Sequence, residues 1–143
     1  MEDISTYFGQ IHRAARDIAT AESHEVGLGR GEWRILHFIG RHPGTTQQAI
    51  SSKYGINKAA TARQCASLEE KGLICRIKNE NDGRSRLLYL TNKAMAIRDK
   101  AHTDMEIIHE QFMAGMTAAE KEELARLLEK MCRNIPCDHN DLS

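Results

Sequence analysis

The residues best suited to chemistry in this chain are basic ones, and they gather in the middle of the sequence. Residues 53–93 contain nine lysines and arginines against four acidic residues, a net charge of +5, although the whole chain has a formal net charge of zero. A basic segment between acidic ends is the electrostatic pattern of a surface that binds a polyanion such as DNA. The nine residues are Lys53, Lys58, Arg63, Lys71, Arg76, Lys78, Arg84, Arg86 and Lys93.

Two of these cations, Lys58 and Arg63, fall in the first half of a helix that we expect over about residues 57–71. A helix fits the major groove of B-DNA, where an arginine can donate two parallel hydrogen bonds to a guanine. A lysine is better suited to a phosphate, which it meets as a flexible point charge. We expect DNA contacts from this helix and the one before it, made by Thr46, Gln47, Lys58, Ala59, Ala62, Arg63 and Gln64.

A second basic group follows in an expected β-hairpin, or wing, over about residues 74–90. Ile74–Lys78 alternates as a strand, Arg86–Leu90 forms the return strand, and Asp82–Gly83 between them is a strong turn signal. This arrangement puts Arg84 at the tip, where it can enter the minor groove, with Lys78 and Arg86 near the DNA backbone.

Periodicity and capping signals predict the helices that position these residues. A second helix is expected over residues 32–41, ended by His42–Pro43–Gly44. Thr45 and Gln48 have the spacing of a capping box for a short third helix, which buries Ala49 and Ile50 and ends at Gly55. Asn57 is the expected N-cap of the next helix. Two short helices joined by such a turn are typical of a helix-turn-helix.

Helices are also predicted at both ends of the chain, each with an apolar stripe. The first helix has a seam with heptad spacing, and a long helix over about 92–113 begins after Thr91. Thr117 and Glu120 form a capping box for the last helix. One small lobe cannot use so much apolar surface, so we expect a second copy to cover it, although packing within the chain is the alternative. The stripes are Ile4, Phe8, Ile11, Ala15 and Ile18 in the first helix and Leu124, Leu127, Leu128 and Met131 in the last.

The expected fold is therefore mainly α with a small β hairpin. It comprises an N-terminal dimerisation helix over 1–26, a winged helix-turn-helix lobe over 28–91 and C-terminal dimerisation helices over 92–143. The low aromatic content of 5% suits packed aliphatic helices better than a β-sandwich.

In order and spacing, these landmarks resemble the MarR family of bacterial regulators over nearly the whole chain. The resemblance is carried by Gly31–Leu36, Ser67–Ile74, Asp82–Gly83–Arg84 and Leu90–Thr91. It implies a homodimer with interlocked terminal helices, a palindromic operator and repression. It also implies that Arg84 enters the minor groove and that Asp82 orients the wing. The chain departs from the family in having Ala59 and Ala62 where hydroxyls are common, and Gln64 where an apolar residue is usual.

The resemblance further implies control by a small aromatic or phenolic ligand, thiol oxidation or metal. For a ligand, Arg16 is expected to pair with an anion and Trp33 to stack, in a pocket lined by Ile11, His12, Ala15, Arg16, Trp33 and His37. A redox role would fall to Cys65, Cys75, Cys132 or Cys137, with Cys132 and Cys137 also able to bind metal with His139. A metal site would draw on His37, His42, His102, Glu106 and His109.

Other functional classes have less support in the sequence. There is no phosphate loop, nucleophile elbow or His-Glu-x-x-His motif, so we expect neither an enzyme nor a cofactor. A winged helix used only for protein interaction is the remaining alternative, but it does not need a basic reading surface. Without a signal peptide or an apolar run of about 20 residues, the protein is expected in the cytoplasm with reduced thiols and no membrane contact.

Overall fold

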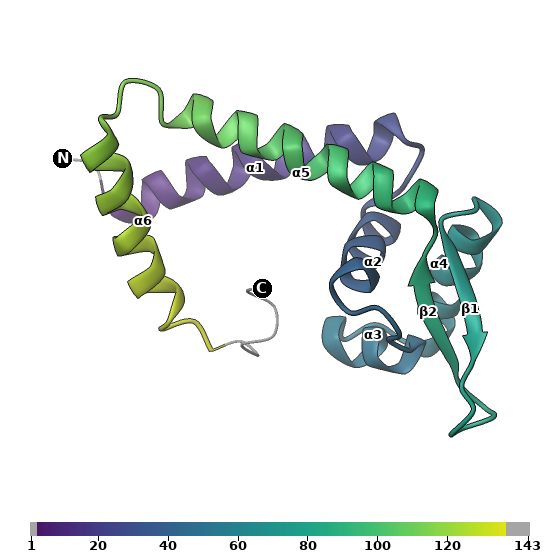
Figure 1. The fold of residues 1–143 in the computed structure, drawn as a ribbon. Coiled ribbons are helices and arrows are strands. Elements are labelled where there is room, and N and C mark those ends of the chain that lie inside the picture. The colour runs from purple at the N-terminus through teal and green to yellow at the C-terminus, as the bar shows by residue number, and fades with distance from the viewer. Residues whose placement is uncertain (1–2, 137–143) are drawn as a thin grey trace. The chain divides into compact units, whose positions relative to one another are not determined.

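The computed structural model describes residues 3–136, which form six helices and one two-stranded antiparallel sheet (Figure 1). The chain divides into two compact units, residues 1–99 and 100–143, with the boundary inside helix α5 (Asn92–Phe112). The expected fold class, mainly α with a small β hairpin in a winged helix-turn-helix lobe, is confirmed. Within residues 3–136, no helix is long and apolar enough to span a bilayer.

The first unit is built around α2 (Arg30–Arg41). Its residues Ile35, Leu36 and Ile39 are completely buried, and they pack in one core with Leu68 of α4 (Lys58–Glu70) and other apolar side chains. Helix α2 is thus buried on more than one side, as its dense apolar pattern predicts. Helix α1 (Ile4–Glu25) also lies in this unit, yet its only buried residue is Ser23.

The helix-turn-helix is fixed by local hydrogen bonds. Helix α3 (Gln47–Tyr54) begins at Thr46, whose Oγ1 accepts from the amide of Ala49 at 3.2 Å. It ends at Gly55, whose φ of 64° is a left-handed conformation that glycine adopts without strain. Asn57 then caps α4 as expected, since its Oδ1 accepts from the amide of Ala60 at 2.7 Å.

Two details of the α3 prediction are wrong. The N-cap is Thr46 rather than Thr45, because the backbone of Thr45 pairs with Leu88 in an isolated β-bridge. The amide of Leu88 donates to the carbonyl of Thr45 at 2.8 Å, so Thr45 is an extended residue held by the wing. Ala49 is exposed, and only Ile50 of α3 is buried.

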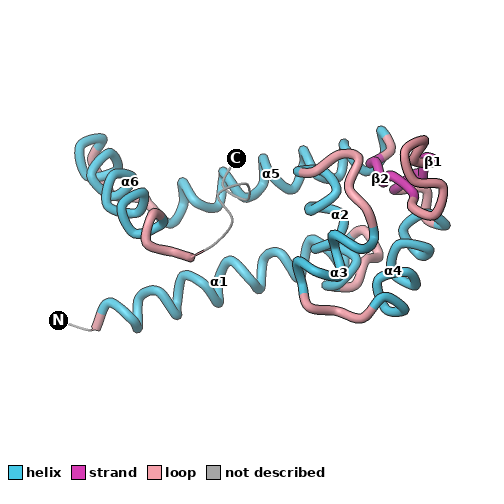
Figure 2. The backbone as a smooth tube through the Cα atoms, turned by 90° about the horizontal axis from the view of Figure 1, so that it is seen from below, coloured by secondary structure: helices cyan, strands magenta, loops and turns pink. Residues whose placement is uncertain are grey.

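The wing consists of β1 (Ile74–Lys78) and β2 (Arg86–Leu90), which have the predicted limits. Strand β1 contacts α4, and β2 contacts α2 (Figure 2). At the base of the wing, Thr91 Oγ1 donates to the carbonyl of Gly72 at 2.7 Å and accepts from the amide of Ala94 at 3.3 Å. Thr91 therefore caps α5, which begins after it as predicted. It also ties this helix to Gly72, just beyond the end of α4.

The end of α4 is anchored to the start of α2 by a small polar cluster. Lys71 Nζ lies 2.9 Å from Glu32 Oε2 and donates to the carbonyl of Gly27 at 3.1 Å. Ser67 Oγ donates to the same Glu32 oxygen at 3.1 Å. Glu32, Ser67 and Lys71 all lie in the segments that carry the family resemblance, so those segments position the recognition helix.

In the second unit, α6 (Ala118–Cys132) follows α5. The predicted capping box is present, with Glu120 accepting from the amide of Thr117 at 2.7 Å and donating its own amide to Thr117 Oγ1 at 3.2 Å. No residue of α6 is buried within the single chain.

Candidate nucleic-acid interface

A groove lies between the helix-turn-helix and the wing, and it brings together six of the predicted DNA-contact and wing-orienting residues. It has a volume of about 550 Å³. The predicted residues that line it are Thr46, Gln47, Lys58, Asp82, Arg84 and Arg86, and they are joined by Gln48, Ser51, Arg76, Asn79 and Ser85.

The groove is suited to a polyanion. Lys58, Arg76, Arg84 and Arg86 line it against a single carboxylate, Asp82. The N-terminal residues Gln47 of α3 and Lys58 of α4 lie in the lining, so both helix dipoles present their positive ends to the groove. Helix N-termini together with cations are favourable positions for phosphate groups.

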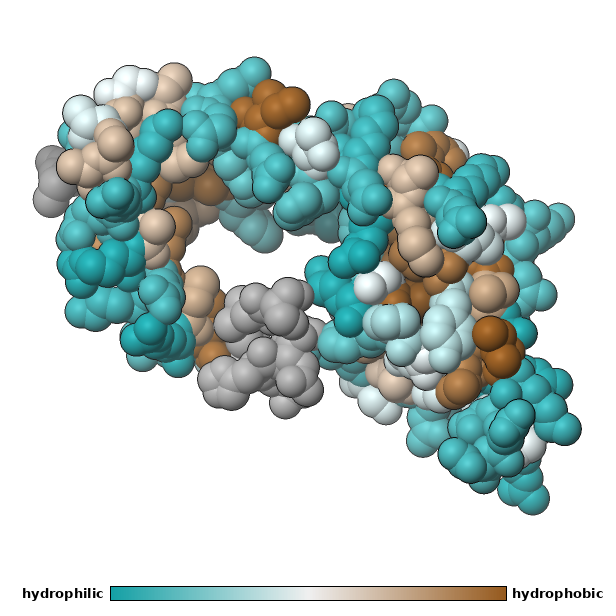
Figure 3. All heavy atoms as spheres, in the orientation of Figure 1, coloured by the Kyte–Doolittle hydropathy of each residue, from teal (hydrophilic) through white to brown (hydrophobic). Residues whose placement is uncertain are grey.

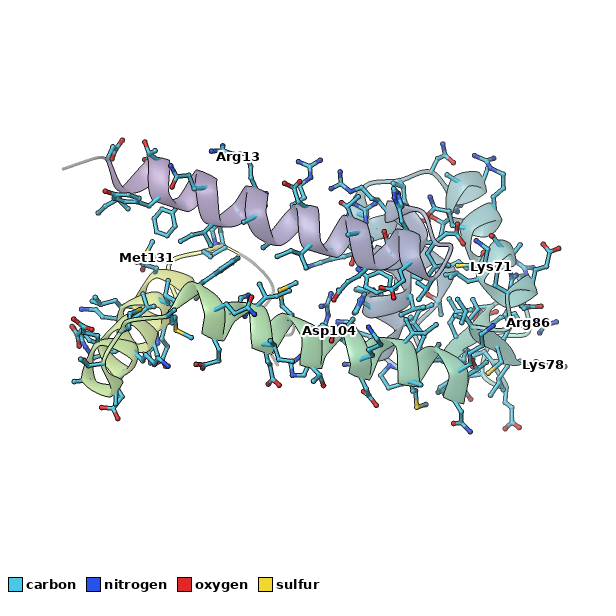
Figure 4. The ribbon with its side chains drawn as sticks, turned by 90° about the horizontal axis from the view of Figure 1, so that it is seen from above. Arg13, Lys71, Lys78, Arg86, Asp104 and Met131 are labelled. Atoms are coloured by element: carbon cyan, nitrogen blue, oxygen red, sulfur yellow. The ribbon has the colours of Figure 1, made fainter. Side chains whose placement is uncertain are left out.

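The register of the hairpin explains how the wing becomes basic toward its tip. The directly opposed pairs on one face are Ile74 with Leu90, Arg76 with Leu88, and Lys78 with Arg86. The face therefore changes from buried apolar residues at the base to cations at the end, where Lys78 and Arg86 lie close together (Figure 4). Like charges directly opposite each other destabilise a hairpin, and an anion bound between them relieves that repulsion.

The tip of the wing, residues 79–85, is ordered by its own polar groups. Asp82 Oδ1 accepts from the amide of Arg84 at 3.0 Å, and the carbonyl of Asp82 accepts from the amide of Ser85 at 3.2 Å. Asn79 Nδ2 donates to Ser85 Oγ at 3.1 Å and closes the turn. Through these bonds Asp82 holds the backbone of the wing tip in place. The projecting end of the hairpin is hydrophilic on the face seen in Figure 3.

Helix α4 presents only part of its predicted reading surface. Lys58, Ala59 and Arg63 are exposed, and Ala62 is half-buried. Gln64 is also half-buried, and its amide group lies so close to Gly31 of α2 that a Cβ there would clash with it. Its Oε1 is buried without a hydrogen-bond partner. Gln64 therefore packs against α2, and its contact with DNA stays a prediction.

A cavity near the predicted effector pocket has a lining that differs from the predicted one. A cavity of about 360 Å³ lies between α1 and α2, and of the six expected residues only Arg16 and Trp33 line it. Ile11 and His12 are exposed, while Ala15 and His37 lie outside the lining. An effector contact by these four residues stays a prediction. The full lining is Arg16, Ala19, Thr20, Ser23, Arg30, Gly31, Trp33 and Arg34.

His37 is a structural group with an unusual pKa. Its ring contacts Trp33 edge-on at 4.6 Å between centroids, and its Nε2 is buried without a hydrogen-bond partner. Burial, followed by repulsion from Arg41 and Arg98, lowers the pKa of His37 from 6.5 to about 4. The imidazole is thus neutral in the folded protein at neutral pH.

The lowered pKa of His37 predicts a loss of stability in mild acid. Between about pH 6.5 and pH 4 the unfolded chain binds a proton at His37 that the folded chain does not, so folding weakens as pH falls through this range. Thermal unfolding at pH 7 and pH 5 should show a smaller decrease in Tm for His37→Gln than for the parent. The matched control is His102→Gln, which alters a side chain that is 76% exposed. Equal decreases in all three proteins would contradict this assignment.

The cysteines lie in different environments. Cys65 is buried in α4, and burial raises the pKa of its thiol, an effect that the nearby Arg76 guanidinium opposes. A buried thiol with a raised pKa is a poor nucleophile, which favours a packing role. Cys75 is exposed and Cys132 half-buried, and both are free thiols. Cys137 and His139 lie outside the described residues.

The histidines and acids considered for metal binding are not brought together. Within residues 3–136, no group of three histidine, cysteine, aspartate or glutamate side chains is close enough to hold a metal ion. His102 Nε2 does lie 3.3 Å from Glu106 Oε1, one helical turn away on α5.

Of the five groove residues that the sequence did not predict, Arg76 is the cation. The sequence places it in the basic segment and in the first strand of the hairpin. The alternation of β1 does place it on the same face as Lys78. That periodicity was the available signal.

A helix-turn-helix followed by a basic hairpin, with a cationic groove between them, defines a winged-helix DNA-binding protein. The comparisons with known proteins agree with this class. The MarR family model matches residues 26–85. The chain is 28% identical over 138 residues to an uncharacterized HTH-type transcriptional regulator, YybA, of Bacillus subtilis, covering 96% of this chain and 92% of that protein. Over its winged helix-turn-helix lobe, this chain is therefore similar to the MarR family of transcriptional regulators.

Two further relatives are relevant to function. The homoprotocatechuate degradative operon repressor of Escherichia coli is 27% identical over 99 residues, which cover 69% of this chain and 67% of that protein. A solved structure of a putative MarR family regulator from Listeria monocytogenes, complexed with 26mer DNA, is 29% identical with a TM-score of 0.70. That match covers 94% of this chain and 90% of the Listeria chain.

Proposed function

We propose that this protein is a repressor that binds a palindromic operator as a homodimer and is released from it by a small aromatic anion. The observation that carries the proposal is the cationic groove, in which Lys58, Arg84 and Arg86 from two separate segments face one space. The name of the Escherichia coli relative and the DNA in the Listeria structure support this function by analogy.

Each part of the interface has a distinct proposed role. Arg63, exposed on α4, reads a guanine edge in the major groove, and Arg84 at the wing tip enters the minor groove. Lys58, Lys78 and Arg86 bind phosphates, as do the polar side chains of Thr46 and Gln47 at the start of α3. Ala59 and Ala62 contribute apolar contacts of the kind that recognise a thymine methyl group.

The homodimer is supported by apolar side chains that the single chain leaves uncovered. On α1, Ile4 is 65% and Ile11 57% exposed, and on α6, Leu127, Leu128 and Met131 are each more than 40% exposed. A two-fold dimer presents two recognition helices to half-sites about one helical turn apart.

Selection of bound DNA tests the proposal directly. The full-length protein is mixed with sheared genomic DNA of the producing cell, and the captured fragments are sequenced. The proposal expects an enriched sequence with two-fold symmetry and half-site centres roughly 10 base pairs apart. Enrichment of an asymmetric sequence would contradict the palindrome, and capture without any enrichment would contradict specific recognition.

The cavity between α1 and α2 is the proposed effector site. Its lining combines Trp33 with Arg16, Arg30 and Arg34 and contains no carboxylate. An aromatic ring can stack on the indole, while an attached carboxylate pairs with a guanidinium. This combination favours small aromatic acids over neutral aromatic compounds.

Trp33 provides a direct test because it is the only tryptophan of the chain. We expect a hydroxybenzoate to quench its fluorescence with saturation, and Arg16→Gln to weaken that binding about fivefold by removing one charge-assisted contact. Arg13→Gln is the matched control, since Arg13 lies on α1 outside the cavity lining. If emission does not change at millimolar ligand, or if both variants behave alike, this site is wrong.

A further inference from the structure

An ion pair joins the two elements that the proposed function places on DNA. Arg76 Nε on β1 lies 2.6 Å from Glu69 Oε2, which is in the last turn of α4. The side chain of Arg76 is 28% exposed and that of Glu69 is 50% exposed. The ion pair thus joins α4 to the wing at the border between the hydrophobic core and the groove.

The place of Arg76 in the hairpin explains why its guanidinium is held in this way. Its cross-strand partner Leu88 is completely buried, so the base of the Arg76 side chain rests on the core. Its end lines the groove together with Lys58, Arg84 and Arg86. A long side chain with a buried stem and a polar end at the border of a groove loses little further freedom when it binds a ligand there.

The ion pair with Glu69 leaves the hydrogen-bonding capacity of Arg76 unused at Nε, which is buried and has no hydrogen-bond partner among the described residues. A guanidinium has five N–H donors in a rigid plane, and the contact with Glu69 is made through Nε. The ion pair fixes the position of Nε beside Glu69, while the two terminal nitrogens extend beyond it. Those nitrogens are the donors that bind phosphate with two parallel hydrogen bonds.

We propose that Arg76 binds a DNA phosphate in the groove and that Glu69 is a positioning residue that orients the Arg76 guanidinium for this contact. The inference rests on the proposed DNA-binding function and adds a phosphate contact that couples the recognition helix to the wing. The alternative is a purely structural ion pair, which holds the wing against α4 while Arg76 does not touch DNA.

The salt dependence of DNA binding distinguishes these roles. Each phosphate contact contributes about 0.9 to the slope of log K against log salt concentration. A duplex of about 30 base pairs with random sequence serves as the probe, because non-specific binding depends on phosphates alone. Arg76→Gln should weaken binding about fivefold to tenfold per dimer and reduce the slope by about 2, one contact in each subunit. Arg126→Gln on α6, from an Arg–Glu pair with a 2.6 Å contact, is the control that should leave the slope unchanged.

The positioning role of Glu69 needs a variant that keeps the charge. Glu69→Asp withdraws the carboxylate by one methylene, and it should weaken binding about threefold in the parent background but have no effect in the Arg76→Gln background. Arg76→Lys should keep the parental slope with weaker binding, because the charge remains while the planar fork is lost. Circular dichroism and Tm of each variant establish that the fold is retained.

The outcomes of these experiments distinguish a failure of the Arg76–Glu69 inference from a failure of the proposed DNA-binding function. A parental slope in Arg76→Gln, or equal weakening by Glu69→Asp in both backgrounds, would overturn the inference and leave DNA binding intact. A parent protein that does not bind the duplex at low salt would overturn the proposed function itself. Should Arg76→Gln fail to fold, Arg76→Lys still decides, since binding as tight as the parent's or a lower slope would contradict the proposed contact.

Discussion

Replacing Arg84 with alanine is expected to weaken operator binding about 30-fold or more while the fold and the subunit assembly stay unchanged. Arg84 lines the groove at the wing tip, and its amide is held by Asp82 Oδ1 at 3.0 Å. An arginine in a narrow minor groove binds a strongly negative potential. With about 1–2 kcal/mol lost in each of two subunits, the combined loss exceeds 2 kcal/mol, which corresponds to about 30-fold.

Fluorescence anisotropy with the selected operator, at one fixed salt concentration, measures this effect. Arg133→Ala is the control, since it removes an exposed arginine of the C-terminal segment that pairs with Glu129. Tm and hydrodynamic mass should match the parent for both variants. Operator binding by Arg84→Ala that equals the parent would show that the wing tip does not touch DNA.

Replacing Leu128 with glutamate is expected to convert the proposed homodimer into monomers at micromolar concentration. Leu127, Leu128 and Met131 are 42–44% exposed on α6 although all three are apolar. Burying a carboxylate in each half of a two-fold interface introduces two unpaired charges, each of which costs several kcal/mol. Lys130→Glu is the matched control, because Lys130 is exposed on the same helix. Sedimentation velocity should give a monomer mass for Leu128→Glu and a dimer mass for the control.

The same variant should also lose most of its operator affinity, since a monomer meets only one half-site. The affinity loss should diminish as protein concentration rises and the dimer re-forms. A Leu128→Glu protein that remains dimeric would show that this part of α6 lies outside the interface. A monomer that binds operator as tightly as the parent would contradict the two-half-site geometry.

Much of the fold could be predicted because its elements are set by local signals. The strand limits Ile74–Lys78 and Arg86–Leu90 follow from alternation on either side of Asp82–Gly83. The caps at Asn57 and Thr117 are each made by a side chain and an amide three residues later. Signals of this range do not depend on tertiary structure, and they were sufficient to predict the winged helix-turn-helix.

The errors occur where a distant residue decides a local choice. Thr45 has the sequence of an N-cap, but Leu88 holds its backbone in a β-bridge, and Thr46 takes the cap. The packing of Gln64 was also not predicted, because Gly31 leaves a space that its amide fills. Arg76 was predicted in its strand, but its ion pair with Glu69 was not. In each case the deciding contact joins residues seven to 43 positions apart.

The salt dependence of operator binding by the unaltered protein tests the central claim most directly. The lobe presents its cations in one groove, so binding should release several counterions, and log K should fall linearly with log salt concentration with a slope steeper than about −4. This result would agree with at least four or five phosphate contacts per dimer. A flat response between 50 and 300 mM salt, roughly the range over which such contacts lose their strength, would contradict the account of the groove as a DNA-binding surface.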